Sequence, residues 1–109
     1  MKERRLDVCL LYVIVRTIIA MKITFDPVKD VFNTAKHGVS LTVACELEWD
    51  TALVWPDDRK NYGECRMAGL ALRGTRVFCV VFTDRGEARR IISLRKANAR
   101  EVRRYVAEN

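Results

Sequence analysis

The sequence has little of what metal sites and membrane spans require. It contains one histidine and four cysteines, and no two of the cysteines have C-x-x-C spacing. A zinc site usually draws its four ligands from such motifs, so we expect no metal site. We expect no other cofactor either. The apolar run Val8–Val15 covers eight residues between two charges, which is too short to cross a bilayer. We therefore expect a protein that does not span a membrane.

The first twenty residues are the unusual part of the chain. A basic start and an apolar run resemble a signal peptide, but residues 17–20 make a poor cleavage site. We favour a translation start at Met21, which leaves residues 1–20 as an upstream extension outside the fold. Two alternatives are a segment buried against a partner and a peripheral membrane anchor. Cys45 and Cys79 lie in apolar runs, which indicates buried thiols and a cytoplasmic protein.

Charge is distributed unevenly along the chain. The net charge is +6, and residues 85–104 alone hold eight bases and two acids. Residues 46–64 are acidic, with six acids and two bases. A basic surface rich in arginine attracts phosphate groups, whereas the simplest alternative is a solvated helix face.

Hydrophobic periodicity predicts one α+β domain over residues 21–109. A strand over 21–26 precedes a helix that Asp26 caps, Pro27 begins and Gly38 ends. The expected inner face of that helix is Val28, Val31, Phe32 and Ala35, and Ser40 caps a second short helix. Strands are expected at 51–58, 65–72, 76–84 and 88–95, and a last helix at 96–108. Short turns between the strands predict an antiparallel sheet, on which two N-terminal helices and the C-terminal helix pack.

Three motifs occur in order along this domain. They are N-x-x-K-H-G-V-S at Asn33–Ser40, E-x-R at Glu64–Arg66, and R-I-I-S-x-R-K-A with E-x-x-x-Y between Arg90 and Tyr105. From Met21 to Tyr105 the chain resembles the BrnT family of bacterial type II toxins. The resemblance implies a RelE-like fold, a ribonuclease activity that blocks translation, and a cognate ribbon-helix-helix antitoxin. It also implies that promoter DNA is bound only through the toxin–antitoxin complex.

Two departures from the family pattern accompany the resemblance. Family members usually carry acids after the serine, where this chain has Leu41, Thr42 and Val43. They usually carry a small residue where this chain has Leu94. Neither change removes a reactive group, but the first leaves the second helix without an acidic first turn.

RNA cleavage without a metal needs a base, an acid and cations that stabilise the phosphorane-like transition state. His37 can act as the acid or the base, although a histidine in the last turn of a helix can also simply bond terminal carbonyls. We expect Arg95 and Arg66 to hold the phosphate, followed by Arg90. Strand alternation places Arg89, Ser93 and Arg95 on one face, and Arg90, Ile92 and Leu94 on the other.

The remaining candidates either bind RNA or support the site. Predicted substrate-binding residues are Lys36, Arg89, Lys96, Arg100, Arg103 and Arg104, of which the last three can instead meet an acidic antitoxin segment. Predicted supporting residues are Glu64, Ser93, Glu101 and Tyr105. Glu64 can pair with Arg66, and Tyr105 is expected to be a buried structural residue. The alternative function is a non-catalytic module that binds nucleic acid or a protein partner.

Overall fold

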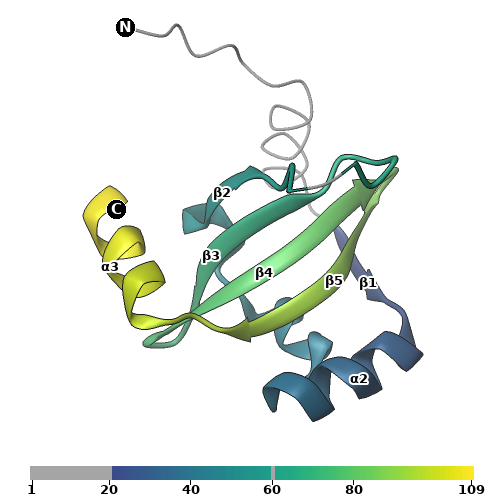
Figure 1. Cartoon of the computed structure of the whole chain (residues 1–109), viewed down its shortest axis with the longest axis horizontal. Coiled ribbons are helices and arrows are strands. Elements are labelled where there is room, and N and C mark those ends of the chain that lie inside the picture. The colour runs from purple at the N-terminus through teal and green to yellow at the C-terminus, as the bar shows by residue number, and fades with distance from the viewer. Residues whose placement is uncertain (1–20, 60) are drawn as a thin grey trace, which may run out of the picture.

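The protein, as a computed structural model, is described over residues 21–59 and 61–109 (Figure 1). The interpretation of residues 1–20 as an extension therefore lies outside the described residues. The elements in chain order are β1 (Lys22–Phe25), α2 (Pro27–His37), the 3₁₀ helices η1 (Leu41–Glu46) and η2 (Trp49–Thr51), β2 (Leu53–Pro56), β3 (Met67–Arg73), β4 (Arg76–Arg85), β5 (Ala88–Lys96) and α3 (Ala99–Glu108). This confirms an α+β fold.

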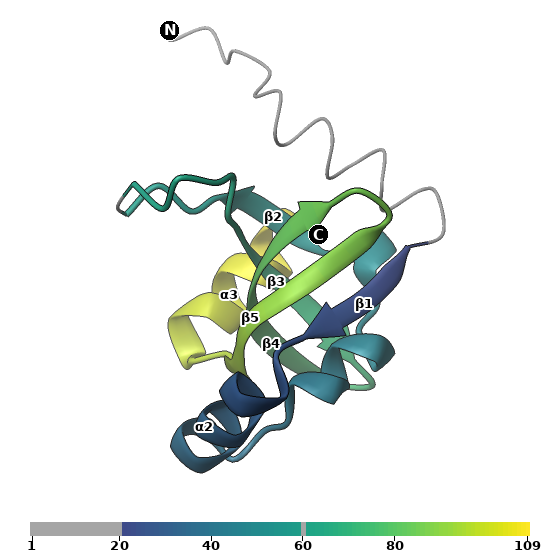
Figure 2. The ribbon, with the colours of Figure 1, turned by 90° about the vertical axis from the view of Figure 1, so that its right-hand side faces the viewer.

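The sheet is mixed and not wholly antiparallel, which corrects the prediction. Its strand order is β1-β5-β4-β3-β2. Strands β2 to β5 pair antiparallel, but β1 pairs parallel with β5. Figure 2 shows β1 along the outer edge of β5. A parallel pair needs a long crossover, and the chain between these strands supplies one. Short turns could specify only the pairing of consecutive strands.

The helices begin next to their capping residues. Asp26 accepts a hydrogen bond from the Val28 N–H at 2.8 Å, and Gly38 ends α2 in the left-handed region at φ 70°. Both bounds of α2 were predicted. The second N-terminal helix is not an α-helix: η1 is a 3₁₀ helix capped by Ser40. Asn98 and Glu101 form a capping box, so α3 begins later than predicted.

The two faces of the sheet carry separate apolar clusters. One contains Leu41, Ala44 and Phe82 and lies beneath η1. The other contains Leu70, Val77, Cys79 and Tyr105 and lies beneath α3. The three-residue repeat of η1 turns Leu41 and Ala44 inward and leaves Cys45 exposed, so the prediction of a buried Cys45 was wrong.

Helix α2 packs with the opposite face from the one predicted. Val28, Val31 and Phe32 are exposed, whereas Asn33 is buried. The Asn33 amide donates to the Leu94 carbonyl at 2.8 Å and accepts from the Leu94 N–H at 3.2 Å. Strand β1 pairs with β5 only as far as Ile91, so the amide takes over as hydrogen-bonding partner of the strand edge beyond β1. A polar anchor therefore sets the orientation of this helix.

Candidate functional site

A β-bulge in β5 decides which arginines share a face. Val81 pairs with Ser93 and Phe82 pairs with Ile91, so Ile92 is the extra residue. The bulge changes the alternation, and the predicted grouping of Arg89 with Ser93 and Arg95 was wrong. Arg89 now faces the cluster beneath η1. Across the bulge, Arg90 shares the opposite face with Ser93 and Arg95.

Arg89 is a structural residue. Its side chain and that of Asp84 are 1% and 2% exposed, and they form a bidentate ion pair with distances of 2.7 and 2.9 Å. The guanidinium also lies over the rings of Trp49 and Phe82, at 4.7 and 4.4 Å from their centroids. A side chain enclosed in this way cannot reach RNA, so the prediction that Arg89 binds substrate does not fit its position.

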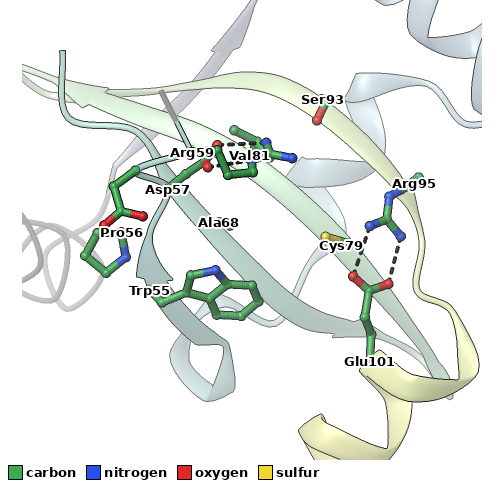
Figure 3. A pocket seen from close by; sticks show the side chains of 11 residues that line it. Trp55, Pro56, Asp57, Arg59, Ala68, Cys79, Val81, Ser93, Arg95 and Glu101 are labelled. Atoms are coloured by element: carbon green, nitrogen blue, oxygen red, sulfur yellow. Dashed lines mark hydrogen bonds and ion pairs between the residues drawn. The ribbon is translucent and has the colours of Figure 1, made fainter. Parts of the chain in front are cut away.

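A pocket of about 290 Å³ lies on the other face, between the sheet and α3. Its lining comes from every strand except β1, from α3 and from the chain after β2: Trp55, Pro56, Asp57, Asp58, Arg59, Ala68, Cys79, Val81, Ser93, Arg95 and Glu101. Figure 3 shows Asp57 and Arg59 on one side of this pocket, and Arg95 with Glu101 on the other. Three of the predicted site residues, Ser93, Arg95 and Glu101, therefore meet here.

Arg95 and Glu101 form a bidentate ion pair across the junction of β5 and α3. The two N–H···O distances are 2.8 and 2.9 Å. Glu101 also accepts the Asn98 N–H at 2.9 Å, so one carboxylate both caps α3 and orients the guanidinium. The Arg95 hydrogen bond lowers the pKa of Glu101, and Glu101 in turn raises the pKa of Arg95. Arg95 remains 38% exposed and has five donors in total, so it can still bind a phosphate.

The opposite wall was missed by the sequence analysis. The Asp57 side chain is 3% exposed and accepts two hydrogen bonds from Arg59, at 2.7 and 2.9 Å. The hydrogen bond from Arg59 holds the pKa of Asp57 below its ordinary value. The only sequence signal was the acidic pair Asp57 and Asp58 after Pro56, which ends the strand predicted over 51–58. Nothing in that pair indicated that β4 and β5 would face it.

His37 does not line the pocket, but the charge of Arg95 reaches it and contributes to lowering its pKa. It is the last residue of α2. Partial burial, followed by the charges of Lys36 and Arg95, lowers its pKa. The neutral imidazole is therefore the main form at neutral pH, and this form can accept a proton. Lys36 beside it is exposed.

The other two predicted phosphate ligands lie outside the pocket lining. Arg66 pairs with Glu64 at 3.2 Å and stacks over the Tyr62 ring at 4.1 Å, while Glu64 also accepts from Arg85. The predicted Glu64–Arg66 pair is therefore present. Arg90 approaches Asp26 only loosely, at 3.9 Å. Of the four predicted catalytic residues, only Arg95 lines the pocket, and His37, Arg66 and Arg90 are not part of its lining.

The basic residues of the C-terminal quarter are mostly at the surface. Lys96, Arg100 and Arg103 are exposed, and Arg104 lies 4.2 Å above the Trp55 ring. Tyr105 is buried, and its hydroxyl donates to the Thr51 carbonyl at 3.3 Å. This confirms the structural interpretation of Tyr105.

Glu101→Gln isolates the charge of the Arg95–Glu101 pair, because glutamine can still serve the capping box. We expect the free energy of unfolding of the variant to be about 1 kcal/mol lower than that of the parent at pH 7. The effect is modest because solvent screens the half-exposed Arg95. The folded pKa of Glu101 is lowered, so this stabilisation is present above its unfolded pKa and is lost as the pH falls through the folded value. Urea unfolding at pH 7 and pH 3 measures the effect. If the difference in unfolding free energy between parent and variant were as large at pH 3 as at pH 7, the Glu101 charge would not be its cause.

The family model described as "Ribonuclease toxin, BrnT, of type II toxin-antitoxin system" matches residues 25–101. This chain belongs to the BrnT toxin family. The match contains Arg66, Arg95 and His37, and it ends at Glu101, the partner of Arg95. No curated protein matches the chain at a significant level.

No helix in the described part of the chain is long and apolar enough to cross a membrane. Among residues 21–59 and 61–109, no cluster of three or more histidine, cysteine or acidic side chains could hold a metal ion.

Proposed function

We propose that this BrnT family member is a metal-independent endoribonuclease that blocks translation by cleaving RNA in the cytoplasm. We also propose that it has the RelE-like fold and a ribbon-helix-helix antitoxin, and that it reaches promoter DNA only within their complex. The family match supports the ribonuclease class. We assign the activity to this site because the half-exposed guanidinium of Arg95 lines a pocket of about 290 Å³.

The proposed reaction uses the 2′-OH of the RNA as nucleophile. His37, neutral at pH 7 because its pKa is lowered, takes the proton of the 2′-OH. The oxygen attacks phosphorus, the bond to the 5′-oxygen breaks, and a 2′,3′-cyclic phosphate remains. The leaving 5′-oxygen takes a proton from solvent water, and His37 afterwards releases the proton of the 2′-OH to solvent. Arg95, with Arg66 and Arg90, offsets the negative charge that develops on the phosphoryl oxygens.

The ion pair between Arg95 and Glu101 leaves Arg95 able to bind the phosphate of the RNA. Glu101 accepts hydrogen bonds from two of the five donors of Arg95, and a phosphate would bind the remaining donors while Glu101 keeps the guanidinium oriented. Lys36, Lys96, Arg100, Arg103 and Arg104 would guide the RNA, since they lie at or near the surface.

The test is expression of the full chain in bacteria, followed by RNA cleavage assays with purified protein in the presence of EDTA. We expect growth arrest and cleavage that the chelator does not abolish. Intact RNA and normal growth would refute the activity.

A second function is favoured by the pairing of the arginines themselves. Arg66, Arg90 and Arg95 each lie close to a carboxylate. Arginines held in ion pairs can bind RNA phosphates without taking part in catalysis. A non-catalytic module predicts RNA binding that weakens with salt, with no cleavage at any pH.

A further inference from the structure

Helix α2 presents an apolar stripe to solvent. Val28, Val31 and Phe32 are 62%, 68% and 70% exposed, and their spacing puts them on one face of the helix together with Ala35. In the described part of the chain, only one other large hydrophobic residue is exposed, Val106 on α3. A cluster of exposed apolar side chains of this kind is typical of a surface that another molecule covers.

The outward orientation of the stripe is held by the polar face of the helix. Asn33 gives its amide to the Val39 and Leu94 carbonyls, both at 2.8 Å. One turn earlier, the Asp30 carboxylate accepts the Leu41 N–H at 2.7 Å and the Ser40 hydroxyl at 3.1 Å. Turning the helix to bury the stripe would break these bonds and leave buried donors unpaired. The exposure of the stripe therefore follows from the way the helix is anchored.

The charges beside the stripe limit what can cover it. Lys29 and Lys36 are exposed and follow one flank of the stripe, and neither forms an ion pair within residues 21–59 and 61–109. The one acid on the helix, Asp30, is already engaged with Ser40 and Leu41. A second copy of this basic chain would bring lysine against lysine, and RNA offers nothing to the apolar side chains. An apolar segment flanked by carboxylates complements both features.

We propose that the α2 stripe is the docking surface for an acidic amphipathic segment of the cognate antitoxin. The inference rests on the proposed toxin function for the identity of the partner. Lys36 and His37 end the same helix, so a segment bound along α2 would lie beside His37 and obstruct its access to RNA. Inhibition would then begin at α2 and not at the arginine-rich helix α3.

The test is the affinity between the full chain and the product of the reading frame adjacent to its gene, measured by titration calorimetry. Phe32→Glu removes an apolar contact and sets a carboxylate against the acidic segment, so we expect affinity to fall at least about 30-fold, as for an interface hot spot. Lys29→Glu should weaken binding and reduce its dependence on salt. Val106→Glu is the matched control, equally exposed but on α3, and should change affinity less than about 3-fold.

Each other outcome is decisive. Equal losses for Phe32→Glu and Val106→Glu, or no binding by the parent chain, would overturn the proposal. So would light scattering that showed Phe32→Glu abolishing self-association while antitoxin affinity stayed unchanged, because the occupant would then be a second copy. RNA cleavage by the free Phe32→Glu variant should equal that of the parent. If the parent cleaves no RNA but Phe32→Glu still weakens antitoxin binding, the docking surface stands and the ribonuclease assignment fails.

Discussion

Arg89→Ala is expected to lower the free energy of unfolding by about 3–5 kcal/mol. The substitution leaves the Asp84 carboxylate, 2% exposed, without the guanidinium that neutralises it. It also removes the cation that lies over Trp49 and Phe82 in the cluster beneath η1. The effect is large because an uncompensated charge in the interior cannot be screened by water. Urea denaturation at pH 7 measures it.

The neighbouring residue supplies the control. Arg90→Ala removes the same side chain one position later, but Arg90 is 36% exposed and 3.9 Å from Asp26, so the loss should stay below about 1 kcal/mol. Replacing both Arg89 and Asp84 with apolar residues should cost less than Arg89→Ala alone, since no buried charge is left behind. Equal losses for Arg89→Ala and Arg90→Ala would show that the pair contributes little.

Arg95→Ala is expected to reduce the rate of RNA cleavage about 10²- to 10³-fold, the usual cost of removing one donor that stabilises transition-state charge. Arg95 is the one predicted catalytic residue in the lining of the pocket, and Glu101 accepts hydrogen bonds from only two of its five donors. Arg95→Lys keeps the charge but loses the bidentate geometry, so it should restore only part of the rate. Single-turnover cleavage of a short RNA measures both variants.

The controls for this prediction separate catalysis from simple attraction of RNA. Arg103→Ala removes an exposed arginine from α3, and it should weaken RNA binding slightly without changing the single-turnover rate. A double Arg95→Ala, Arg66→Ala variant that remained as toxic as the parent chain would remove both residues from the site. Circular dichroism of each variant confirms that the fold is retained.

The sequence predicted the local features of this chain well, because they depend on residues a few positions apart. The bounds of α2 follow from Asp26, Pro27 and Gly38, and the 3₁₀ helix begins after Ser40 as its cap requires. The motif from Arg90 to Tyr105 and the concentration of arginine were also visible, and they led to the family that the comparison shows. These features need no information about distant parts of the chain.

Three features were decided only by the tertiary structure. The extra residue Ile92 in β5 depends on the register with β4, and a one-residue shift moves side chains to the opposite face. The same shift buries Arg89 and leaves Arg95 facing the pocket. Helix α2 has an apolar stripe that periodicity placed inside, yet the hydrogen bonds of Asn33 to Leu94 turn it outward. Periodicity measures how side chains divide between two faces of an element, whereas long-range hydrogen bonds decide which of those faces meets the rest of the protein.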